Sequence, residues 1–534
     1  MLKQMPLRLK YFFMAIFAGC LYALGFPNEF IPVLVVGPIF GLGLLFHLLD
    51  IDHSKKIRFL DRAFILLAFS LGYSSFGFYW IPHTLKEFGG LSAPWNYFLG
   101  TAFSLIIVPQ YWIFLITLHW YNKRARFLRL PHPWLKHILF ALILTTLEFV
   151  VPQQFPAHPG HSWMEMAPHL SLAPIGGVPL FSFMSYWLAF CVRQPLQQRQ
   201  DWWGVACGLT FVFINALFPL SLQHDPNQVL KIRIVQPNIG NFMKLDSERG
   251  GRDSIEKVFA SYEQLSLHDK SPVDLIIWPE TAYPSTLLSG LMKKHYKLTP
   301  KLMRDIIDQT SAEMVIGGYD RNPDSPGNFM GEYNAAFHIG LDGKLKDVYR
   351  KQLLIPFGEG LPFGPLNKPL SKVLSNVSFF AAGEDFPIFN ASNSFSFASI
   401  ICYEALFSSF IAEYLNSNEA RPDFILNLTN DSWYGDTSEP YQHLFLAKWR
   451  AVEFAIPMVR STNTGVSSVV YADGSESVRT GVFEQNVLQV ELAKSTSKKT
   501  PFQRFGLWVT WFIAIILGAT IFLGTYLTRK TLAH

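Results

Sequence analysis

Long apolar segments at the two ends of the chain limit its architecture more than any other feature. A helix of about 20 apolar residues crosses a lipid bilayer, and segments close to this length recur before residue 223 and again near the C-terminus. The expected spans are 11–27, 30–49, 63–82, 97–120, 137–151, 178–193, 203–222 and 506–527. Only 16% of the 534 residues are charged, whereas soluble domains carry about a quarter. The sequence therefore predicts a polytopic α-helical membrane domain of about eight spans.

Basic residues are unevenly distributed over the loops between these spans. Lysine and arginine are retained on the cytoplasmic side of membrane proteins. The basic loops, all on one side, contain Lys3, Arg8, Lys10, Lys55, Lys56, Arg58, Arg62, Lys123, Arg124, Arg126, Arg129, Lys136, Arg193 and Arg199. On the other side, Lys86 stands alone between the third and fourth spans, and residues 151–177 carry no Lys or Arg. An N-terminus inside the cell therefore places residues 223–505 outside.

The first apolar segment has a second interpretation, because a basic start before an apolar run is also typical of a cleaved signal peptide. A second span follows so closely that we favour a retained helical hairpin. The formal net charge of +5 reflects the basic inside loops, and no stripe of aromatic and basic residues indicates nucleic-acid binding. Nucleic acid is therefore not an expected partner.

Cysteine usage singles out one thiol. Cys20, Cys191 and Cys207 fall inside expected spans, which leaves Cys402 without a disulfide partner in the outer segment. An unpaired thiol in an oxidising compartment is a liability. Cys402 is thus either used chemically or deeply buried, and a cysteine at the end of a strand is more often a small core residue.

The outer segment alternates strand-like and helix-like patterns, which is typical of a layered α/β domain. The expected strands are 232–235, 275–278, 314–316, 397–401, 424–428, 458–460 and 466–471, and the expected helices are 254–267, 300–310 and 443–454. The domain organisation that follows is a transmembrane helical domain over 1–225, an outer α/β domain over 226–500, and a final span with a cytoplasmic tail over 501–534.

Reactive residue types stand where several of these strands end. Glu280 follows an apolar strand in "IIWPE", Lys351 precedes the turn "IPFGE", and Cys402 ends "FASII". Each has an ordinary interpretation, as a solvated loop carboxylate, a surface lysine and a core cysteine. Together they supply what thiol acyl transfer needs, because a carboxylate can take the thiol proton and an ammonium can stabilise a thiolate and an oxyanion.

The stretches "IIWPETA", "YRKQLLIPFGEGLPFG", "IICYEALF" and "LNLTNDSWYGDTSEPYQH" occur in this order. The set resembles the nitrilase (carbon–nitrogen hydrolase) superfamily, and its combination with seven spans before the outer domain and one after it resembles the membrane-bound branch, the apolipoprotein N-acyltransferases. The resemblance implies an α-β-β-α sandwich. It also implies that Glu280 is the general base, Lys351 the oxyanion-stabilising lysine and Cys402 the nucleophile.

The resemblance extends to residues beside these three. It implies that Glu359 is a second acidic residue of the site, and Asn334, Tyr403 and Glu404 occupy matching positions. The backbone amide after the cysteine is expected to join the oxyanion hole. The aromatic and apolar residues expected at a lipid entrance, for which core packing is an equal alternative, are Phe357, Leu361, Phe363, Trp433 and Tyr434.

The activity that the resemblance implies is N-acylation of the N-terminal S-diacylglyceryl-cysteine of an apolipoprotein by ping-pong transfer from a membrane phospholipid through a cysteine thioester. The expected partners are the phospholipid donor, the diacylglyceryl apolipoprotein acceptor and the bilayer, with no cofactor. The implied location is the bacterial inner membrane, with the catalytic domain on the periplasmic side. Two alternatives remain: a membrane-tethered amidase that passes its acyl group to water, and a catalytically idle relative that binds lipid or lipoprotein.

Two stretches depart from the family pattern. Leu245 stands in "KLD" where the family carries a tryptophan, and the loop over 152–177 reads "QFPAHPGHSWMEM" in place of the usual pattern. That loop contains His158 and His161, with His169 nearby, which we expect to be solvated or interfacial because no set of cysteines or acidic residues accompanies them. No metal site is assigned.

Overall fold

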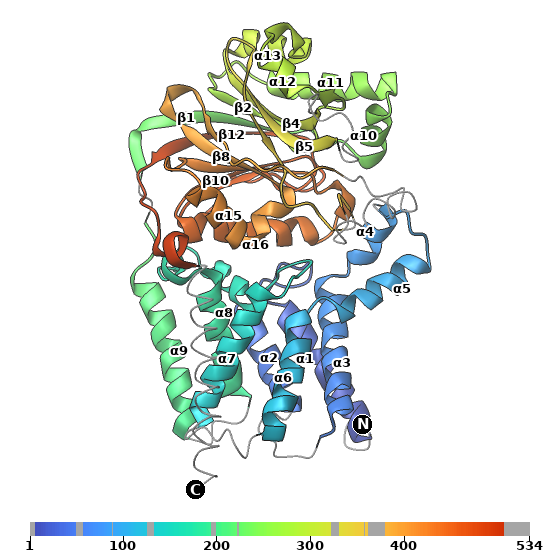
Figure 1. Cartoon of the computed structure of the whole chain (residues 1–534), viewed down its shortest axis with the longest axis vertical. Helices are drawn as coiled ribbons and strands as arrows, with labels where there is room; N and C mark the ends of the chain where they lie inside the picture. Colours follow the sequence, from blue (N-terminus) through green and yellow to red (C-terminus); the bar gives the residue numbers. More distant parts are fainter. Residues whose placement is uncertain are drawn as a thin grey trace. The chain divides into compact units, whose positions relative to one another are not determined.

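The computed structural model describes residues 6–49, 57–87, 89–124, 133–193, 199–221, 224–321, 331–356, 358–360 and 380–506 (Figure 1). Backbone contacts divide the chain into two compact units. The helical unit comprises residues 1–82, 93–220 and 504–534, and the sandwich unit comprises residues 83–92 and 221–503. The sequence did not predict that residues 83–92, which lie between two expected spans, pack with the outer domain.

The helical unit consists of helices that overlap the expected apolar segments but differ from them in their bounds. Its helices are α1 (Leu7–Ala23), α2 (Gly37–Leu48), α3 (Phe59–Gly77), α5 (Trp95–Ala102), α6 (Pro109–Arg124), α7 (Pro133–Val150), α8 (Ala173–Val192) and α9 (Arg199–Leu217). Within the described ranges, α3 and α8 are long and apolar enough to cross a membrane, with mean hydropathies of 1.2 and 1.6. The expected eighth span lies outside the described residues beyond Gly506.

The fourth expected span, over 97–120, is not one straight helix. Residues Trp95–Leu105 and Pro109–Tyr121 form two segments that are bent by 41°. Pro109 begins α6, and a proline disfavours the helical conformation of the residue before it and donates no backbone hydrogen bond. The bent pair would count as a third span by length and composition.

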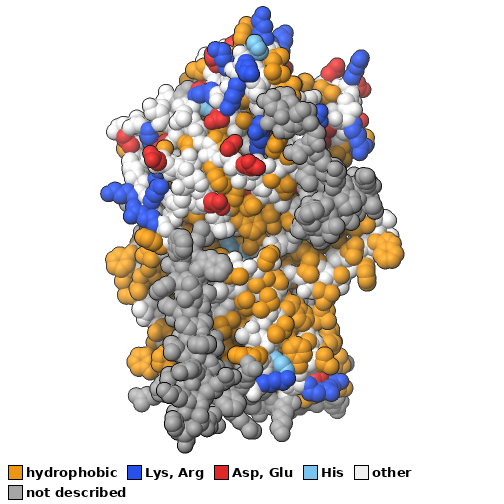
Figure 2. Space-filling model, in the orientation of Figure 1, with side chains coloured by type: hydrophobic (Ala, Val, Ile, Leu, Met, Phe, Trp, Pro, Cys, Tyr) orange, Lys and Arg blue, Asp and Glu red, His pale blue; other side chains and the backbone are white. Residues whose placement is uncertain are grey.

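The helical unit exposes many large apolar side chains. Orange side chains cover much of the lower part of Figure 2, where α1, α3 and α6 lie. The exposed set includes Phe13, Phe17, Phe40, Phe64, Ile116, Trp203, Leu209 and Phe213. Monomeric soluble proteins rarely expose contiguous apolar surface of this kind. This surface suits contact with lipid.

The expectation for the loop histidines is wrong for two of the three. His158 and His161 are buried, with 3% and 2% exposure. The short helix η3 (Pro159–Met166) folds into the unit, where the Gly160 N–H donates to Ser182 Oγ at 3.1 Å. The backbone N–H of His158 also donates to His161 Nδ1 at 3.1 Å. These hydrogen bonds satisfy polar groups that would otherwise hold the loop in water. His169 is exposed.

The sandwich unit contains two mixed sheets. The first sheet has the order β12-β1-β2-β4-β5-β6, with β3 beside β4, and the second has the order β11-β10-β9-β8-β7. The strands of the first sheet are β1 (His224–Gln236), β2 (Leu275–Ile277), β3 (Thr286–Leu287), β4 (Glu313–Arg321), β5 (Glu332–Ile339), β6 (Leu345–Arg350) and β12 (Asn486–Ser495). Those of the second are β7 (Ile388–Asn390), β8 (Ser396–Ile401), β9 (Phe424–Thr429), β10 (Met458–Thr462) and β11 (Ser468–Val470).

Helices cover the outer face of each sheet (Figure 1). On the first sheet lie α10 (Asn241–Glu248), α11 (Arg252–Ser266), α12 (Ser289–Met292) and α13 (Lys301–Thr310), and on the second lie α15 (Ser408–Asn416) and α16 (Glu439–Phe454). This arrangement is the α-β-β-α sandwich that the resemblance implied.

Alternation along the buried strands explains this layering. Leu275 and Ile277 of β2 belong to the apolar core between the sheets, whereas Ile276 belongs to the core beneath the outer helices. Successive side chains of a strand point to opposite faces of its sheet. A run such as "LII", apolar at every position, therefore suits a strand that is covered on both faces.

Candidate active site

Glu280 stands at the end of β2, and close backbone contacts with β4 fix its position. The Gly317 N–H donates to the Pro279 carbonyl at 3.2 Å, and the Ala282 N–H donates to the Gly317 carbonyl at 2.9 Å. A Cβ atom on Gly317 would lie 2.3 Å from the Pro279 oxygen and 2.6 Å from the Glu280 Cα. The glycine is thus required for the close approach that positions Glu280.

Lys351 directly follows β6, and its ammonium lies between two carboxylates. The Lys351 Nζ is 2.7 Å from Glu359 Oε2 and 3.4 Å from Glu280 Oε1. The Asn334 side chain on β5 donates to both carboxylates, to Glu280 Oε1 at 2.7 Å and to Glu359 Oε1 at 3.2 Å. The Lys351 N–H also donates to the Asn334 carbonyl at 2.8 Å. Four predicted site residues, Glu280, Asn334, Lys351 and Glu359, therefore form one buried, hydrogen-bonded cluster.

Charge keeps this lysine protonated. Burial alone would lower the pKa of Lys351, but Glu359 and Glu280 raise it well above its ordinary value. A buried charge is tolerated when it is paired and hydrogen-bonded. Lys351 is consequently a fixed positive charge at the site rather than a proton carrier.

Cys402 follows β8 and begins the short helix η7 (Cys402–Leu406). Its backbone has φ of +51°, a left-handed conformation that is uncommon for a residue with a side chain and that clusters at functional sites. Burial and Glu280 raise the pKa of its thiol well above the ordinary value, while Lys351 lowers it. The resting residue is therefore a thiol that needs a base.

A cavity of about 430 Å³ is lined by six of the predicted site residues, whereas Lys351, Tyr403 and Glu404 do not line it. Cys402, Glu280, Asn334 and Glu359 line it. Trp433 and Tyr434, which the sequence placed at a lipid entrance, also line it, together with Leu245. Phe357, Leu361 and Phe363 lie outside the described residues.

Glu404 is directed to the backbone and not to the cavity. Its Oε1 accepts hydrogen bonds from Gln352 N–H at 2.7 Å and Leu353 N–H at 3.0 Å, and its Oε2 accepts one from Ile401 N–H at 2.7 Å. Burial raises the pKa of Glu404 to about 7, although the Ile401 and Gln352 N–H groups lower it. Glu404 thus ties the segment that bears the cysteine to the segment that bears the lysine. The Tyr403 ring packs edge-on against Phe407, with centroids 4.8 Å apart.

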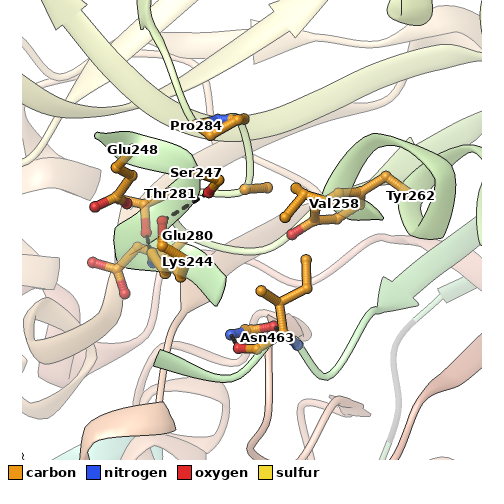
Figure 3. Close-up of a pocket in the computed structure, with 11 residues that line it drawn as sticks. Lys244, Ser247, Glu248, Val258, Tyr262, Glu280, Thr281, Pro284 and Asn463 are labelled. Carbon is orange, nitrogen blue, oxygen red and sulfur yellow. Dashed lines mark hydrogen bonds between the residues drawn. The ribbon is translucent and has the colours of Figure 1, made fainter. Parts of the chain in front are cut away.

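Lys244 is a second buried lysine at the site that sequence reasoning missed. It lies on α10 and hydrogen-bonds to Thr281, beside Glu280, at a smaller cavity of about 10 Å³ (Figure 3). It also lines the large cavity. Burial lowers the pKa of Lys244, and this effect outweighs the negative charges of Glu248 and Glu280, which raise it. The stretch "KLD" gave no sign of this role, because a lysine in a polar helix is usually solvated.

A buried polar chain lies behind Cys402. The stretch "LNLTNDSWYGDTSEPYQH" contains three of its residues, but sequence reasoning assigned them no role at the site. His443 Nε2 is 3.3 Å from the Cys402 carbonyl oxygen, and its Nδ1 is 3.1 Å from Asp431 Oδ1. The Arg460 guanidinium donates to Asp431 Oδ2 at 3.0 Å and to Asn427 Oδ1 at 2.6 Å. The pKa of Asp431 is lowered because Arg460 and His443 outweigh the effect of burial.

This polar chain includes residue types that can bind metal. Ligand-type atoms of Asp431, Glu439 and His443 lie within 4.8 Å of one another. The Arg460 guanidinium already supplies positive charge to Asp431, and burial raises the pKa of Glu439 well above its ordinary value. A cation bound here would be repelled by the Arg460 guanidinium and would have to displace the proton of Glu439. We therefore assign no ion to this cluster.

The segment 83–92 forms part of the wall of the large cavity. Thr84, Glu87 and Gly90 line it. His83 packs against Gly435, whose backbone has φ of +72° and where a Cβ would lie 2.6 Å from the His83 ring. A glycine is therefore needed at this turn for conformation and for space.

Family models match both parts of the chain. A model of the carbon-nitrogen hydrolases matches residues 231–502, and a model of the apolipoprotein N-acyltransferase N-terminal domain matches residues 18–191. The apolipoprotein N-acyltransferase of Bdellovibrio bacteriovorus is 30% identical over 481 residues, which cover 85% of this chain and 84% of that protein. The enzyme of the same name from Haemophilus influenzae is 26% identical over 518 residues, 93% of this chain and 92% of that protein. The chain that carries Glu280, Lys351 and Cys402 therefore belongs to the apolipoprotein N-acyltransferase family of the carbon–nitrogen hydrolases.

Proposed function

We propose that this chain N-acylates the N-terminal S-diacylglyceryl-cysteine of apolipoproteins, with an acyl chain from a membrane phospholipid and through a thioester on Cys402. The observation that carries the proposal is that Cys402 shares one cavity with Glu280 and Glu359, whose carboxylates hold the Lys351 ammonium. The substrate class comes from the family, whose members are named apolipoprotein N-acyltransferases.

The first half-reaction forms the thioester. Glu280 takes the proton of the Cys402 thiol, and the sulfur attacks the carbonyl carbon of an acyl ester. The Lys351 ammonium and the backbone N–H after the cysteine stabilise the negative oxygen of the tetrahedral intermediate. The ester C–O bond then breaks, and Glu280 returns the proton to the departing lysophospholipid oxygen.

The second half-reaction forms the amide. The α-amine of the acceptor attacks the thioester carbon, and Glu280 removes a proton from the nitrogen. The C–S bond breaks, and the thiolate recovers its proton from Glu280. Glu359 and Asn334 do not react in this scheme. Their hydrogen bonds hold Lys351 and Glu280 in place.

Apolar walls favour the amine over water as the acceptor. Leu245, Ile355, Phe380, Trp433 and Tyr434 line the cavity beside the charged cluster. Exclusion of water protects a reactive intermediate from hydrolysis. This feature supports transfer over the amidase alternative, which would use the same three residues.

The membrane arrangement belongs to the same proposal. Residues 1–225 provide seven spans, 226–500 the catalytic domain, and 501–534 the last span and a cytoplasmic tail, in the bacterial inner membrane. The catalytic domain faces the periplasm. Basic loops on one side of the expected spans and exposed apolar side chains on the helical unit support this arrangement, which lets both lipid-anchored substrates reach the site by lateral diffusion.

Intact mass tests the proposal. Purified protein incubated with phospholipid and no acceptor should gain the mass of one acyl chain, which hydroxylamine should remove, and lysophospholipid should be released. Cys402→Ala should gain nothing. Addition of a diacylglyceryl peptide should discharge the adduct onto the peptide amine.

The other outcomes separate the alternatives. Release of free fatty acid in place of acylated peptide would assign the chain to the hydrolytic class. An unmodified protein with no lysophospholipid released would favour a relative that binds lipid without reacting.

A further inference from the structure

We propose that His443 is a positioning residue for the oxyanion hole, because it holds the peptide group whose N–H stabilises the tetrahedral intermediate. The inference rests on the proposed function, since it assigns a role in the acylation of Cys402. It begins from the 3.3 Å contact between His443 Nε2 and the Cys402 carbonyl oxygen.

The group that contacts His443 and the expected oxyanion donor belong to one peptide group. The carbonyl of Cys402 and the N–H of Tyr403 belong to the same planar unit, and in a trans peptide they point in opposite directions. The bond between these residues is not among the cis peptides of the described chain. A donor that fixes the direction of the carbonyl therefore also fixes the direction of the Tyr403 N–H, away from His443.

The backbone needs such a fixing contact at this point. Cys402 has φ of +51°, and a residue with a side chain is strained in this conformation and keeps it when its surroundings hold it. The carbonyl oxygen and the Asp431 carboxylate can each only accept a hydrogen bond, so both contacts of His443 are hydrogen bonds when both ring nitrogens carry hydrogen. Burial and Arg460 lower the pKa of His443, whereas Asp431 raises it and so favours this doubly protonated ring. Withdrawal of electron density at the oxygen also makes the N–H of the same peptide a stronger donor, because hydrogen bonds in series polarise one another.

His443 is itself held by buried charges. Its Nδ1 lies 3.1 Å from Asp431 Oδ1, and Asp431 is paired with Arg460 at 3.0 Å. His443, Asp431 and Arg460 are exposed by 2%, 0% and 0%. A ring with a fixed partner at one nitrogen presents the other nitrogen in a defined direction. The chain of contacts thus leads from Arg460 on β10 to the peptide group beside the nucleophile.

A matched pair of amides separates this role from a purely structural one. The side-chain nitrogen of glutamine can take the place of the His443 Nε2. The side-chain nitrogen of asparagine can take the place of Nδ1. His443→Gln keeps a donor for the Cys402 carbonyl and should retain most of the acylation rate. His443→Asn keeps the contact with Asp431 and loses the carbonyl contact. Since loss of an oxyanion donor costs about 10²–10³ in rate, a misdirected donor should slow acylation by about 10- to 100-fold.

Two reactions of the same thiol provide the readout. Single-turnover acylation by phospholipid, followed by intact mass, needs the oxyanion hole. Alkylation of Cys402 by iodoacetamide needs the thiolate and no oxyanion donor, so its rate in His443→Asn should remain within about twofold of wild type. The expected result is slow acylation with normal alkylation in His443→Asn and recovery of acylation in His443→Gln.

Three results would overturn the proposal. Wild-type acylation in His443→Asn would show that the peptide needs no support from His443. A parallel loss of acylation and alkylation in both variants, with a lower melting temperature, would show that the histidine only maintains the fold. If wild-type protein itself gains no acyl chain but is alkylated at Cys402, then the proposed function fails, and this inference fails with it.

Discussion

The thiol of Cys402 lies among opposing charges. Burial and Glu280 raise its pKa, whereas Lys351 lowers it. The carboxylate that makes the resting thiol hard to ionise is also the group that accepts its proton during reaction. The thiolate is therefore expected to form as the acyl group arrives rather than in the free enzyme.

Replacement of Glu280 by glutamine should change two reactions of this thiol in opposite directions. Loss of the negative charge lowers the Cys402 pKa, so iodoacetamide alkylation at neutral pH should become faster. Acylation should become slower by about 10² or more, because general acid–base catalysis by the carboxylate is lost. Glutamine keeps an oxygen that can accept the hydrogen bond from Asn334.

The matched control is Glu491→Gln, which neutralises an exposed carboxylate on β12. It should leave the pH dependence of alkylation and the acylation rate unchanged. A slower alkylation in Glu280→Gln would contradict the assigned effect of this charge.

Sequence reasoning identified the residues that bear motifs and missed those that support them. Glu280, Lys351 and Cys402 stand in short stretches that order and spacing make recognisable. Lys244 stands in an ordinary helical pattern, and His443 ends one of the quoted stretches without a residue type that marks it as part of the site. Their relation to the site arises when α10 and α16 pack against the ends of the strands. A buried lysine or histidine cannot be distinguished from a solvated one by local sequence.

Among the elements, β4 has the most direct influence on the site, because Gly317 lets the backbone of Glu280 approach it. Gly317→Ala places a methyl group 2.3 Å from the Pro279 oxygen. Overpacking of this kind destabilises a protein by about 1–3 kcal/mol, and displacement of a catalytic group by about 1 Å can cost 10²-fold in rate. Thermal unfolding and single-turnover acylation measure the two effects.

Gly290→Ala provides the control for this change. It adds the same methyl group on α12, where no atom lies within 4 Å. Its acylation rate should equal that of wild type. If Gly317→Ala acylates normally as well, then the position of Glu280 does not depend on this close approach.

The strands that the sequence predicted are those with mostly apolar runs, such as "FASII" and "FILNL". It missed the short strands β3 and β7, and also β5, β6 and β12, in which polar and charged residues interrupt the apolar ones. The turn between β5 and β6 contains Asp342-Gly343, with Gly343 at φ of +72°, and this dipeptide between two strand patterns is a hairpin signal. The expected third helix of the outer segment, from 443, begins at Glu439 in the structure because Pro440 suits the first turn.

For the whole molecule, the apolar segments and the basic loops lead to a topology that labelling can test. In a Cys207→Ala background, a cysteine at Val478, which is 79% exposed, should react with a membrane-impermeant maleimide in cells whose outer membrane is permeable. A cysteine at Lys123, in an expected inside loop, should react after the inner membrane is opened. Labelling of position 123 in intact spheroplasts would contradict the proposed orientation.

The whole-molecule features that sequence could not supply are those that connect distant segments. Composition and loop charge predicted the spans. Four motifs predicted the sandwich, and the family comparison confirms the sandwich. The bend before Pro109 could have been read from the proline. The packing of residues 83–92 into the sandwich unit could not have been predicted, because that segment lies more than a hundred residues before β1.

This packing makes the enzyme difficult to divide. Thr84, Glu87 and Gly90 line the cavity of a domain that otherwise begins at residue 221. A soluble fragment cut at the domain boundary would keep every motif residue and still lack one wall of its cavity. For protein engineering, the transplantable catalytic module is therefore a discontinuous one, and a chimera that joins this sandwich to another membrane anchor would need to carry the short insert along with it.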